Sequence, residues 1–283
     1  MSLALVVVTH DAEADLRRLL PTIAAHLPQA ELVVADTGSR DASRQLARAA
    51  GATVLALPRE TGYGAANNAG VAAVRAPVCV LLNPDCALLD DGLARLAPRE
   101  GELLAPRLRG LDGAVERSAH PRPGTARALL PALLPSALLP VRAEPHRATA
   151  PRRVGWAIGA CLVARTSTLR ALGPFDPAPH LFYEDLDLCL RAGAVVLRPD
   201  VEVVHAGGTA TRRHFGGEPH DVQARRRREV VAARLGPRAL ALDDAAQALT
   251  FATRAAGRGL LRRDPSRPLQ QLHALRRART VSP

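Results

Sequence analysis

The feature that most constrains this chain is an alternation of apolar runs and amphipathic segments along its N-terminal part. Leu3–Thr9 is a continuous run of Leu, Ala and Val before its final Thr, which is typical of a strand buried on both faces of a parallel sheet. Glu13–His26 follows with apolar residues at helical spacing, and Pro28 ends that pattern. Another apolar run at 31–35 indicates a second strand. This order predicts the first β-α-β unit of an α/β fold.

The same alternation continues after a turn at 37–41. The further predicted elements are a helix at 42–50, a strand at Thr53–Leu57, a helix at 65–75 and a strand at Val78–Leu82. Strands and helices repeated in this way predict a doubly wound parallel sheet flanked by helices. Ligands of such sheets bind beyond the carboxyl ends of the strands. We therefore expect the functional site in the loops that follow these strands.

The pattern changes twice further along the chain. Residues 97–153 are rich in Pro and Arg, and within them 126–141 reads as short apolar turns that touch a membrane, cover an acceptor site or pack as a surface loop. From residue 154 a strand-like segment, an acidic helix start and short strands at 195–197 and 201–204 return. Beyond residue 217 the chain is rich in Arg, Ala and Leu, which predicts a basic helical extension.

The net charge of +11 comes from arginine alone among the strong bases, because the chain has no lysine. Such a charge favours an acidic partner, namely a phosphate-bearing substrate, an anionic membrane surface or nucleic acid. Aromatic residues make up only 2% of the chain, which argues against nucleic acid. The four cysteines form no CxxC pair, and the N-terminus starts as a strand without the charged region of a signal peptide. These features predict a cytoplasmic protein without zinc sites.

Polar residues follow the first strands at the expected edge of the sheet. Asp36 ends the second strand, where a carboxylate can bind a ribose or a base N–H, with a turn role as the alternative. The glycine-rich stretch 60–70 leads into a helix, and its backbone N–H groups could approach a phosphate. Asp85, in Asn83-Pro-Asp85 after the fourth strand, is suited to a hard divalent cation or to a turn.

Two further candidates lie in the C-terminal half. Glu184 and Asp185 are adjacent acids at a helix start, so their proton affinities can be pushed apart and one can act as a base. Asp187, in the same cluster, is expected to pair with Arg191 one helical turn later. His205 ends a short strand before two glycines, a position that fits a ligand role and a structural role about equally.

Taken in order, these segments resemble a known family. The blocks VVVTH, VVADTGSRD, TGYGAANNAG, LLNPD, GWAIGACLVAR, FYEDLDLCLRAG and HAGGT are similar to those of the inverting glycosyltransferase family 2, which has the GT-A fold. They most resemble its bacterial rhamnosyltransferase and galactofuranosyltransferase-like branch. The resemblance implies an α/β GT-A domain at 1–217, with a Rossmann-like, mixed but mostly parallel sheet flanked by helices. This domain would consist of a nucleotide-sugar-binding half at 1–96, a variable region at 97–153 and an acceptor half at 154–217. Residues 218–283 would be the helical extension.

The resemblance also implies roles for individual residues. Asp185, with Glu184 beside it, would be the catalytic base. Asp85 and His205 would hold Mg²⁺ or Mn²⁺ against the donor diphosphate. Trp156 and Gly159 would line the acceptor side. The residues implied to bind the nucleotide-sugar donor are Thr9, Asp36, Gly62, Tyr63, Gly64, Asn67 and Asn83. The chain departs from the family pattern where Asn83 replaces the first acid of the metal motif and where Thr37 follows Asp36 instead of a second acid.

The predicted reaction is transfer of a hexose, with rhamnose from dTDP-rhamnose as the first choice, to a hydroxyl of a cell-envelope glycan or lipid-linked acceptor. One alternative is a nucleotidyltransferase, which would need a glycine-rich basic loop after the first strand, where the chain has Thr9-His-Asp-Ala. Another is a non-catalytic basic module that binds membrane or nucleic acid through Arg225–Arg228. Within the transferase hypothesis, the extension would either touch an anionic membrane at the inner face of the cell or present a solvated surface.

Overall fold

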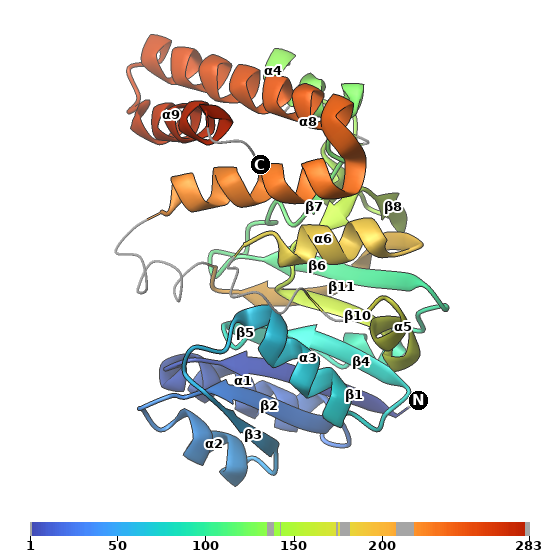
Figure 1. Ribbon diagram of the computed structural model, residues 1–283. Coiled ribbons are helices and arrows are strands. Elements are labelled where there is room, and N and C mark those ends of the chain that lie inside the picture. The colour runs from blue at the N-terminus through green and yellow to red at the C-terminus, as the bar shows by residue number, and fades with distance from the viewer. Residues whose placement is uncertain are drawn as a thin grey trace.

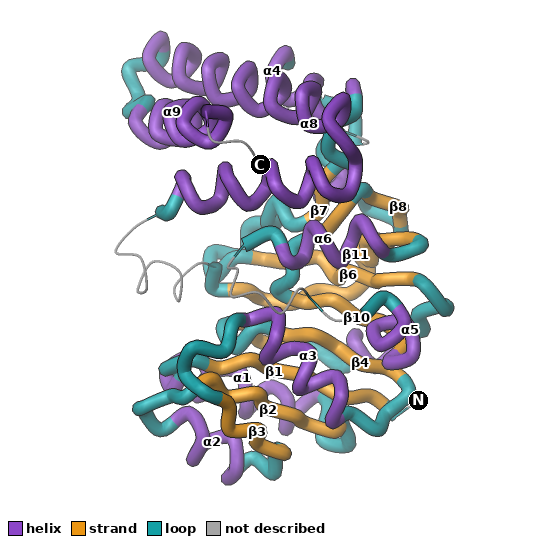
Figure 2. Tube along the Cα trace, in the orientation of Figure 1, coloured by secondary structure: helices purple, strands orange, loops and turns teal. Residues whose placement is uncertain are grey.

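The computed structural model describes residues 2–134, 139–141, 143–173, 175, 182–207 and 218–280. A central sheet lies between layers of helices, and the long C-terminal helices stack beyond α6 (Glu184–Arg191) at the end of the molecule opposite β3 (Thr53–Leu57) (Figure 1). Figure 2 shows the same division, with the strands gathered in one layer and helices on both sides of it.

In the described part of the chain the main sheet has nine strands in the order β3-β2-β1-β4-β10-β6-β11-β5, with β8 also paired to β11. The pairing makes β1, β2, β3, β4, β6 and β11 run in one direction and β5, β8 and β10 in the other. The bounds not yet given are β1 Leu3–Thr9, β2 Glu31–Thr37, β4 Val78–Leu82, β5 Cys86–Leu88, β6 Glu102–Arg109, β8 Arg152–Val154, β10 Cys161–Arg165 and β11 Ala194–His205. The prediction of a mixed, mostly parallel sheet is confirmed.

Alternating side chains of β1 enter two different core layers. Leu3, Leu5 and Val7 pack with apolar residues of α1 (Glu13–His26) on one face of the sheet. Ala4 and Val6 pack on the other face with residues of α3 (Tyr63–Ala73), α5 (Thr166–Ala171) and α6. The remaining helices of the first half are α2 (Ser43–Ala49) and the 3-10 turn η1 (Gly92–Arg95). A strand covered on both faces in this way must be apolar throughout, which is why its sequence signal is strong.

Two predictions about strands after β5 are wrong. The short strands expected at 195–197 and 201–204 are one strand, β11, in which the register against β6 shifts between Arg198 and Glu202 around Pro199. A proline cannot donate a ladder hydrogen bond, so it marks an irregularity in the strand and not its end. The irregular region 97–153 also contains β6, a central strand whose sequence is interrupted by Pro106.

The strand-like segment after residue 154 is divided into three pieces. β8 ends at Val154, β9 (Trp156–Ala157) pairs with β7 (Ala119–His120) in a separate two-stranded sheet, and β10 begins after a turn at 158–160. Gly155 allows the first break, because a Cβ at this position would lie 2.0 Å from the backbone nitrogen of Arg122. The chain therefore changes sheets at a place where only glycine fits.

The C-terminal extension is helical, as predicted, and forms α8 (His220–Leu260) and α9 (Ser266–Thr280). α8 is bent back on itself at Gly236, where φ is 81° and ψ is 176°. Val231 and Leu240, on either side of this bend, belong to the same apolar cluster as Leu186 of α6, so the extension shares the core of the α/β domain. In the described ranges no helix is both long and apolar enough to cross a membrane.

The arginine run of α8 is mostly committed to ion pairs within the protein. Arg227 binds Asp243 through two hydrogen bonds of 2.8 and 2.9 Å, and Arg228 lies 3.2 Å from both carboxylate oxygens of Asp244. Arg225 and Arg226 both lie within ion-pair distance of Glu229. A membrane or nucleic-acid site centred on Arg225–Arg228 is therefore not favoured.

Residues 126–133 pack on α8 as the 3-10 turn η2 (Ala126–Leu129) and α4 (Leu130–Leu133). Ala132 is buried there, but Leu133 remains 63% exposed. The rest of the predicted apolar turns, at 135–138, lies outside the described residues. Of the three alternatives for this region, which were membrane contact, a cover over the acceptor site and a packed surface loop, the described part fits the packed surface loop.

The close approach of α3 to β1 gives a test of the fold. A Cβ at Gly70 would lie 2.3 Å from Cγ1 of Val6, which is fully buried. We expect Gly70→Ala to lower the free energy of unfolding by about 1–3 kcal/mol, because the added methyl group forces the packed core apart. The measurement is urea-induced unfolding followed by circular dichroism.

Gly257→Ala is the matched control, since Gly257 is also helical but a Cβ there meets nothing within 4 Å. This change should raise the free energy of unfolding by up to about 1 kcal/mol, the difference in helix propensity between the two residues. Equal effects at the two positions would contradict the tight packing of α3 on β1.

Candidate active site

Strand ends that point the same way bring the predicted site residues to one rim. Thr9 ends β1, Asp36 lies near the end of β2, and Asn83 follows β4. β10 is antiparallel to both β4 and β6, and β11 is parallel to β6, so His205 at the end of β11 lies at the same rim. Figure 1 shows the two halves of the sheet continuing into one another across β4 and β10.

Asp85 and His205 lie side by side because β5 turns back along β11. The ladder pairs Cys86 with His205, and the backbone oxygen of Asp85 accepts a 2.9 Å hydrogen bond from Ala206. His205 Nε2 is 3.4 Å from Asp85 Oδ1, an ion-pair distance without the alignment of a hydrogen bond. Both side chains are buried, and Asp85 Oδ1 has no hydrogen-bond partner in the described part of the chain. A buried oxygen of this kind is suited to a ligand.

Glu116 contacts the other nitrogen of the His205 ring, with Oε2 3.0 Å from Nδ1. Burial lowers the pKa of the imidazole, but the carboxylates of Asp85 and Glu116 outweigh it and raise the pKa to about 9. Metal-binding histidines commonly give their second N–H to a carboxylate in this way. The sequence did not single out Glu116, because it lies in the irregular region between β6 and β7.

The residues present fit a divalent cation that is shared with a substrate. Among the described residues no three His, Cys, Asp or Glu side chains converge on one point, so a site made of protein ligands alone is not seen there. Asp85 and His205 offer two donors, and a cation bound to one or two side chains normally completes its shell with phosphate oxygens and water. Asn83 is occupied otherwise, because its Oδ1 accepts a 2.9 Å hydrogen bond from the hydroxyl of Tyr63.

Glu184 and Asp185 form the first turn of α6 after a strained entry. Phe182 and Tyr183, directly before them, have left-handed φ values of 83° and 65°, which side chains other than glycine rarely adopt and which costs free energy. Burial raises the pKa of both acids, that of Glu184 to about 7. Glu184 Oε1 is buried without a hydrogen-bond partner among the described residues. The structure thus keeps two acids partly desolvated at this helix start.

One turn, 158–160, connects the two acidic motifs. The N–H of Gly159 donates a 2.8 Å hydrogen bond to Asp185 Oδ2. The carbonyl oxygen of the next residue, Ala160, accepts a 2.8 Å hydrogen bond from the N–H of Asn83. Through these two hydrogen bonds the turn contacts both the carboxylate of Asp185 and the segment that carries Asp85.

The structure buries two of the residues expected to bind the donor. Asp36 is fully buried, and its oxygens accept hydrogen bonds from the Thr9 hydroxyl at 2.9 Å and the Ser39 N–H at 3.0 Å. Both residues hold the ends of β1 and β2 together. Beside them lies a more exposed ion pair, in which Arg59 is 2.7 Å from Asp11 Oδ2. The sequence analysis did not single out this pair.

The glycine-rich block forms the loop before α3 and the first two turns of that helix, close to the acids. Gly62 is the N-cap residue, and Gly64 and Asn67 are buried in the helix. Burial raises the pKa of the Tyr63 hydroxyl, and the negative charges of Glu184 and Asp185 add to the effect. The block therefore lies between the Asn83 motif and the acids of α6.

The acceptor-side tryptophan is packed in an aromatic cluster that the C-terminal extension completes. Trp156 is buried and stacks on His120, with ring centroids 4.2 Å apart, and lies 6.1 Å from Tyr183. The guanidinium of Arg227 lies over both Trp156 and Tyr183, at 5.9 and 5.7 Å from the ring centroids. Arg227 thus reaches the residue that precedes the acids of α6, a contact that the sequence analysis missed.

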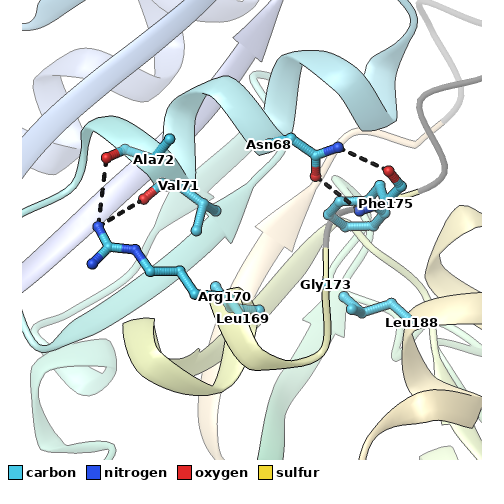
Figure 3. Close-up of a pocket in the computed structure, with 8 residues that line it drawn as sticks. All are labelled: Asn68, Val71, Ala72, Leu169, Arg170, Gly173, Phe175 and Leu188. Atoms are coloured by element: carbon cyan, nitrogen blue, oxygen red, sulfur yellow. Dashed lines mark hydrogen bonds between the residues drawn. The ribbon is translucent and has the colours of Figure 1, made fainter.

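A separate cavity of about 330 Å³ lies between α3, α5 and α6 (Figure 3). Its polar side chains are bound to the backbone, since Asn68 bonds both the N–H and the carbonyl of Phe175, and Arg170 donates to carbonyl oxygens at the end of α3. No residue of the predicted site lines it. We therefore regard it as a packing gap and not as the active site.

The chain is similar to known proteins in sequence and in fold. Residues 4–100 match the family described as Glycosyl transferase family 2. Over 246 residues the chain is 30% identical to the N-acetylglucosaminyl-diphospho-decaprenol L-rhamnosyltransferase of Mycobacterium tuberculosis, covering 75% of this chain and 78% of that protein.

Solved structures show the same fold at lower identity. A mannosyltransferase from Pyrobaculum calidifontis, in complex with GDP-Man and Mn²⁺, matches 98% of this chain and 86% of its own at 15% identity and a TM-score of 0.58. Glucosyl-3-phosphoglycerate synthase from M. tuberculosis, in complex with Mn²⁺, UDP and glucosyl-3-phosphoglycerate, matches 83% of this chain and 80% of its own at 20% identity and a TM-score of 0.52. The expected GT-A fold is confirmed.

The buried Glu184 gives a pH-dependent prediction. Its folded pKa of about 7 lies above the ordinary 4.5, so the folded state binds the extra proton and loses stability as pH rises between these values. Glu184→Gln removes this loss. We expect the variant to gain on the order of 2–3 kcal/mol in unfolding free energy, relative to the wild type, between pH 4.5 and 8.

Glu13→Gln serves as a control of opposite sign. Hydrogen bonds from Arg17 lower the pKa of Glu13, so its charged form stabilises the folded state above the ordinary pKa and its removal lowers stability there. Unfolding at a series of pH values measures both. A Glu184→Gln difference that does not change with pH would contradict the desolvation of this acid.

Proposed function

Because the chain belongs to glycosyl transferase family 2, we propose that it transfers a hexosyl residue, with inversion, from a nucleoside diphosphate sugar to the hydroxyl of a lipid-linked glycan. Glycosyltransferase activity follows from the family; the donor, acceptor and stereochemistry are the proposal. The curated relative acts on a diphospho-decaprenol acceptor with rhamnose, by its name, which makes dTDP-rhamnose the first donor to test. The proposed place of action is the inner face of the cell membrane.

The observation that carries the proposal is the turn 158–160. It holds the carboxylate of Asp185 and the segment of Asp85 at one rim through two hydrogen bonds of 2.8 Å each. A displacement at a sugar carbon needs a base on one side of that carbon and charge stabilisation at the leaving group on the other. We assign the leaving-group side to Asp85 and the base side to Asp185.

On the donor side, Asp85 and His205 would hold a divalent cation, which when bound neutralises the charge of the departing diphosphate. The imidazole favours Mn²⁺ over Mg²⁺, since Mg²⁺ prefers oxygen ligands. Glu116 would keep the His205 ring in position by accepting its Nδ1–H. Tyr63, whose hydroxyl donates to Asn83, would border the donor next to the glycine-rich turn.

On the acceptor side, Asp185 accepts the proton of the attacking hydroxyl. Burial raises its pKa, which makes the carboxylate a stronger base once it is ionised. Its Oδ2 accepts the hydrogen bond from Gly159, which fixes the orientation of the carboxylate. The hydroxyl oxygen attacks the anomeric carbon as the diphosphate leaves, so a single displacement inverts the configuration without a covalent enzyme intermediate.

The base role predicts the effect of Asp185→Asn. Loss of general-base help should lower turnover by about 10²–10⁴, while binding of the nucleoside diphosphate stays within about twofold of the wild type. The measurement is nucleoside diphosphate release with a soluble acceptor mimic, screened over dTDP-rhamnose, UDP-galactofuranose, UDP-glucose and GDP-mannose. Asp187→Asn is the control, because Asp187 pairs with Arg191 and Arg234 and is assigned no chemistry. Normal turnover of Asp185→Asn would remove it from the mechanism.

The metal role predicts a change in binding. With the wild type, addition of Mn²⁺ should tighten nucleoside diphosphate binding at least tenfold, the scale of one charge-assisted contact. Asp85→Ala should abolish this dependence, whereas Asp112→Ala, an exposed acid on the loop after β6, should keep it. Isothermal titration with and without Mn²⁺ gives both values. Equal Mn²⁺ dependence in Asp85→Ala would place the cation elsewhere.

A further inference from the structure

The turn between α8 and α9 exposes apolar and basic side chains together. Leu260 is 87% exposed and Leu261 is 67% exposed, the former being the most exposed large apolar residue among those described. Arg258, Arg262 and Arg263 flank them and are exposed as well. In the part of the chain that the structure describes, none of these three guanidiniums lies within ion-pair distance of a carboxylate. We call residues 257–264 the hairpin tip.

The arms of α8 show where the tip lies. Arg227 pairs with Asp243 and Arg228 with Asp244 across the bend at Gly236, and Figure 1 shows the second arm running back past the first. The second arm therefore returns toward the end of the molecule at which the first arm begins. Figure 1 shows the turn into α9 on the same side as the start of α8 and the carboxyl end of β11.

The second arm is also the longer one. By the same pairing, His220 at the start of the first arm corresponds to about Thr250 on the second, and α8 continues to Leu260. Ten further residues of helix at 1.5 Å each carry the tip about 15 Å beyond that point. The tip thus projects past the start of α8, on the side of the active-site rim.

We propose that the hairpin tip docks the protein on the surface of an anionic phospholipid bilayer. Leucines that enter the headgroup region, ringed by arginines that bind lipid phosphates, are the chemistry of interfacial attachment. The one acid of the tip, Asp264, is occupied in capping α9 through the N–H and hydroxyl of Ser266, so positive charge dominates. The sequence analysis had considered Arg225–Arg228 as the membrane-binding group, but these arginines form ion pairs within the protein. The hairpin tip takes their place in this proposal.

Membrane docking by the tip rests on the proposed function only for its biological purpose. Docking through the tip would turn the rim with Asp85 and Asp185 toward the membrane, where a lipid-linked acceptor presents its sugar. The binding itself depends on the tip alone and can be measured without any sugar donor.

The test is flotation of the full chain with vesicles of phosphatidylcholine and phosphatidylglycerol, against vesicles of phosphatidylcholine alone. We expect binding only to the anionic vesicles, and binding should weaken as salt increases. The double variants Leu260→Ser/Leu261→Ser and Arg262→Gln/Arg263→Gln should each weaken it about tenfold or more. Leu111→Ser, at another leucine that is 68% exposed, should bind like the wild type.

Two outcomes would overturn the proposal. Unchanged flotation of both tip variants would show that the membrane surface lies elsewhere. A wild type that does not float but forms dimers in sedimentation, with Leu260→Ser/Leu261→Ser remaining monomeric, would assign the tip to a second copy of the chain. Nucleoside diphosphate release with a soluble acceptor separates the two hypotheses, because tip variants should keep it fully. Its absence in the wild type would refute the proposed function while leaving the vesicle result valid.

Discussion

The active site depends on two consecutive residues in the turn before β10. Gly159 donates its N–H to Asp185, and Ala160 accepts the N–H of Asn83. The turn can do both because β10 runs antiparallel beside β4, with Cys161 opposite Leu82, so its start meets the end of β4. Glycine suits this position, since a Cβ at residue 159 would lie 3.2 Å from that of Asp185 and would have to displace that side chain slightly. One backbone segment thereby positions Asp185 relative to the end of β4 and the Asn83 motif that follows it.

The C-terminal extension supports this site from the other side. Two neighbouring arginines make the same kind of ion pair but contact different parts of the protein. Arg228 also donates to the carbonyl of Ala278 in α9, which holds the hairpin together. Arg227 lies over Trp156 and Tyr183, directly before the acids of α6. Because Tyr183 has a left-handed backbone, a cation that packs on its ring helps to keep this strained entry in place.

The sequence predicted the elements whose signals are local. β1 to β4 and α1 follow from apolar periodicity. Asp85 and His205 were singled out because they stand at strand ends, where ligands bind, and Asp185 because it is one of two adjacent acids at a helix start. β6 and the continuous β11 were missed, because Pro106 and Pro199 interrupt runs that tertiary pairing nevertheless keeps extended. Glu116 and Arg227 could not be found either. Glu116 acts through His205, which is 89 residues away in the sequence. Arg227 reaches Trp156 and Tyr183 only because of the way the extension folds.

The distribution of charge illustrates the same limit of local patterns. A net charge of +11 and a run of four arginines indicate a basic binding surface. Once α8 bends at Gly236, however, Asp243 pairs with Arg227 and Asp244 with Arg228, each acid sixteen residues after its arginine. These two acids neutralise half of the run. A shorter and less conspicuous group, around Leu260, keeps its charge because the helix that carries it extends past its neighbour. Whether an arginine can meet an external phosphate is therefore decided by the bend of the helix, since the bend determines which acids it meets first.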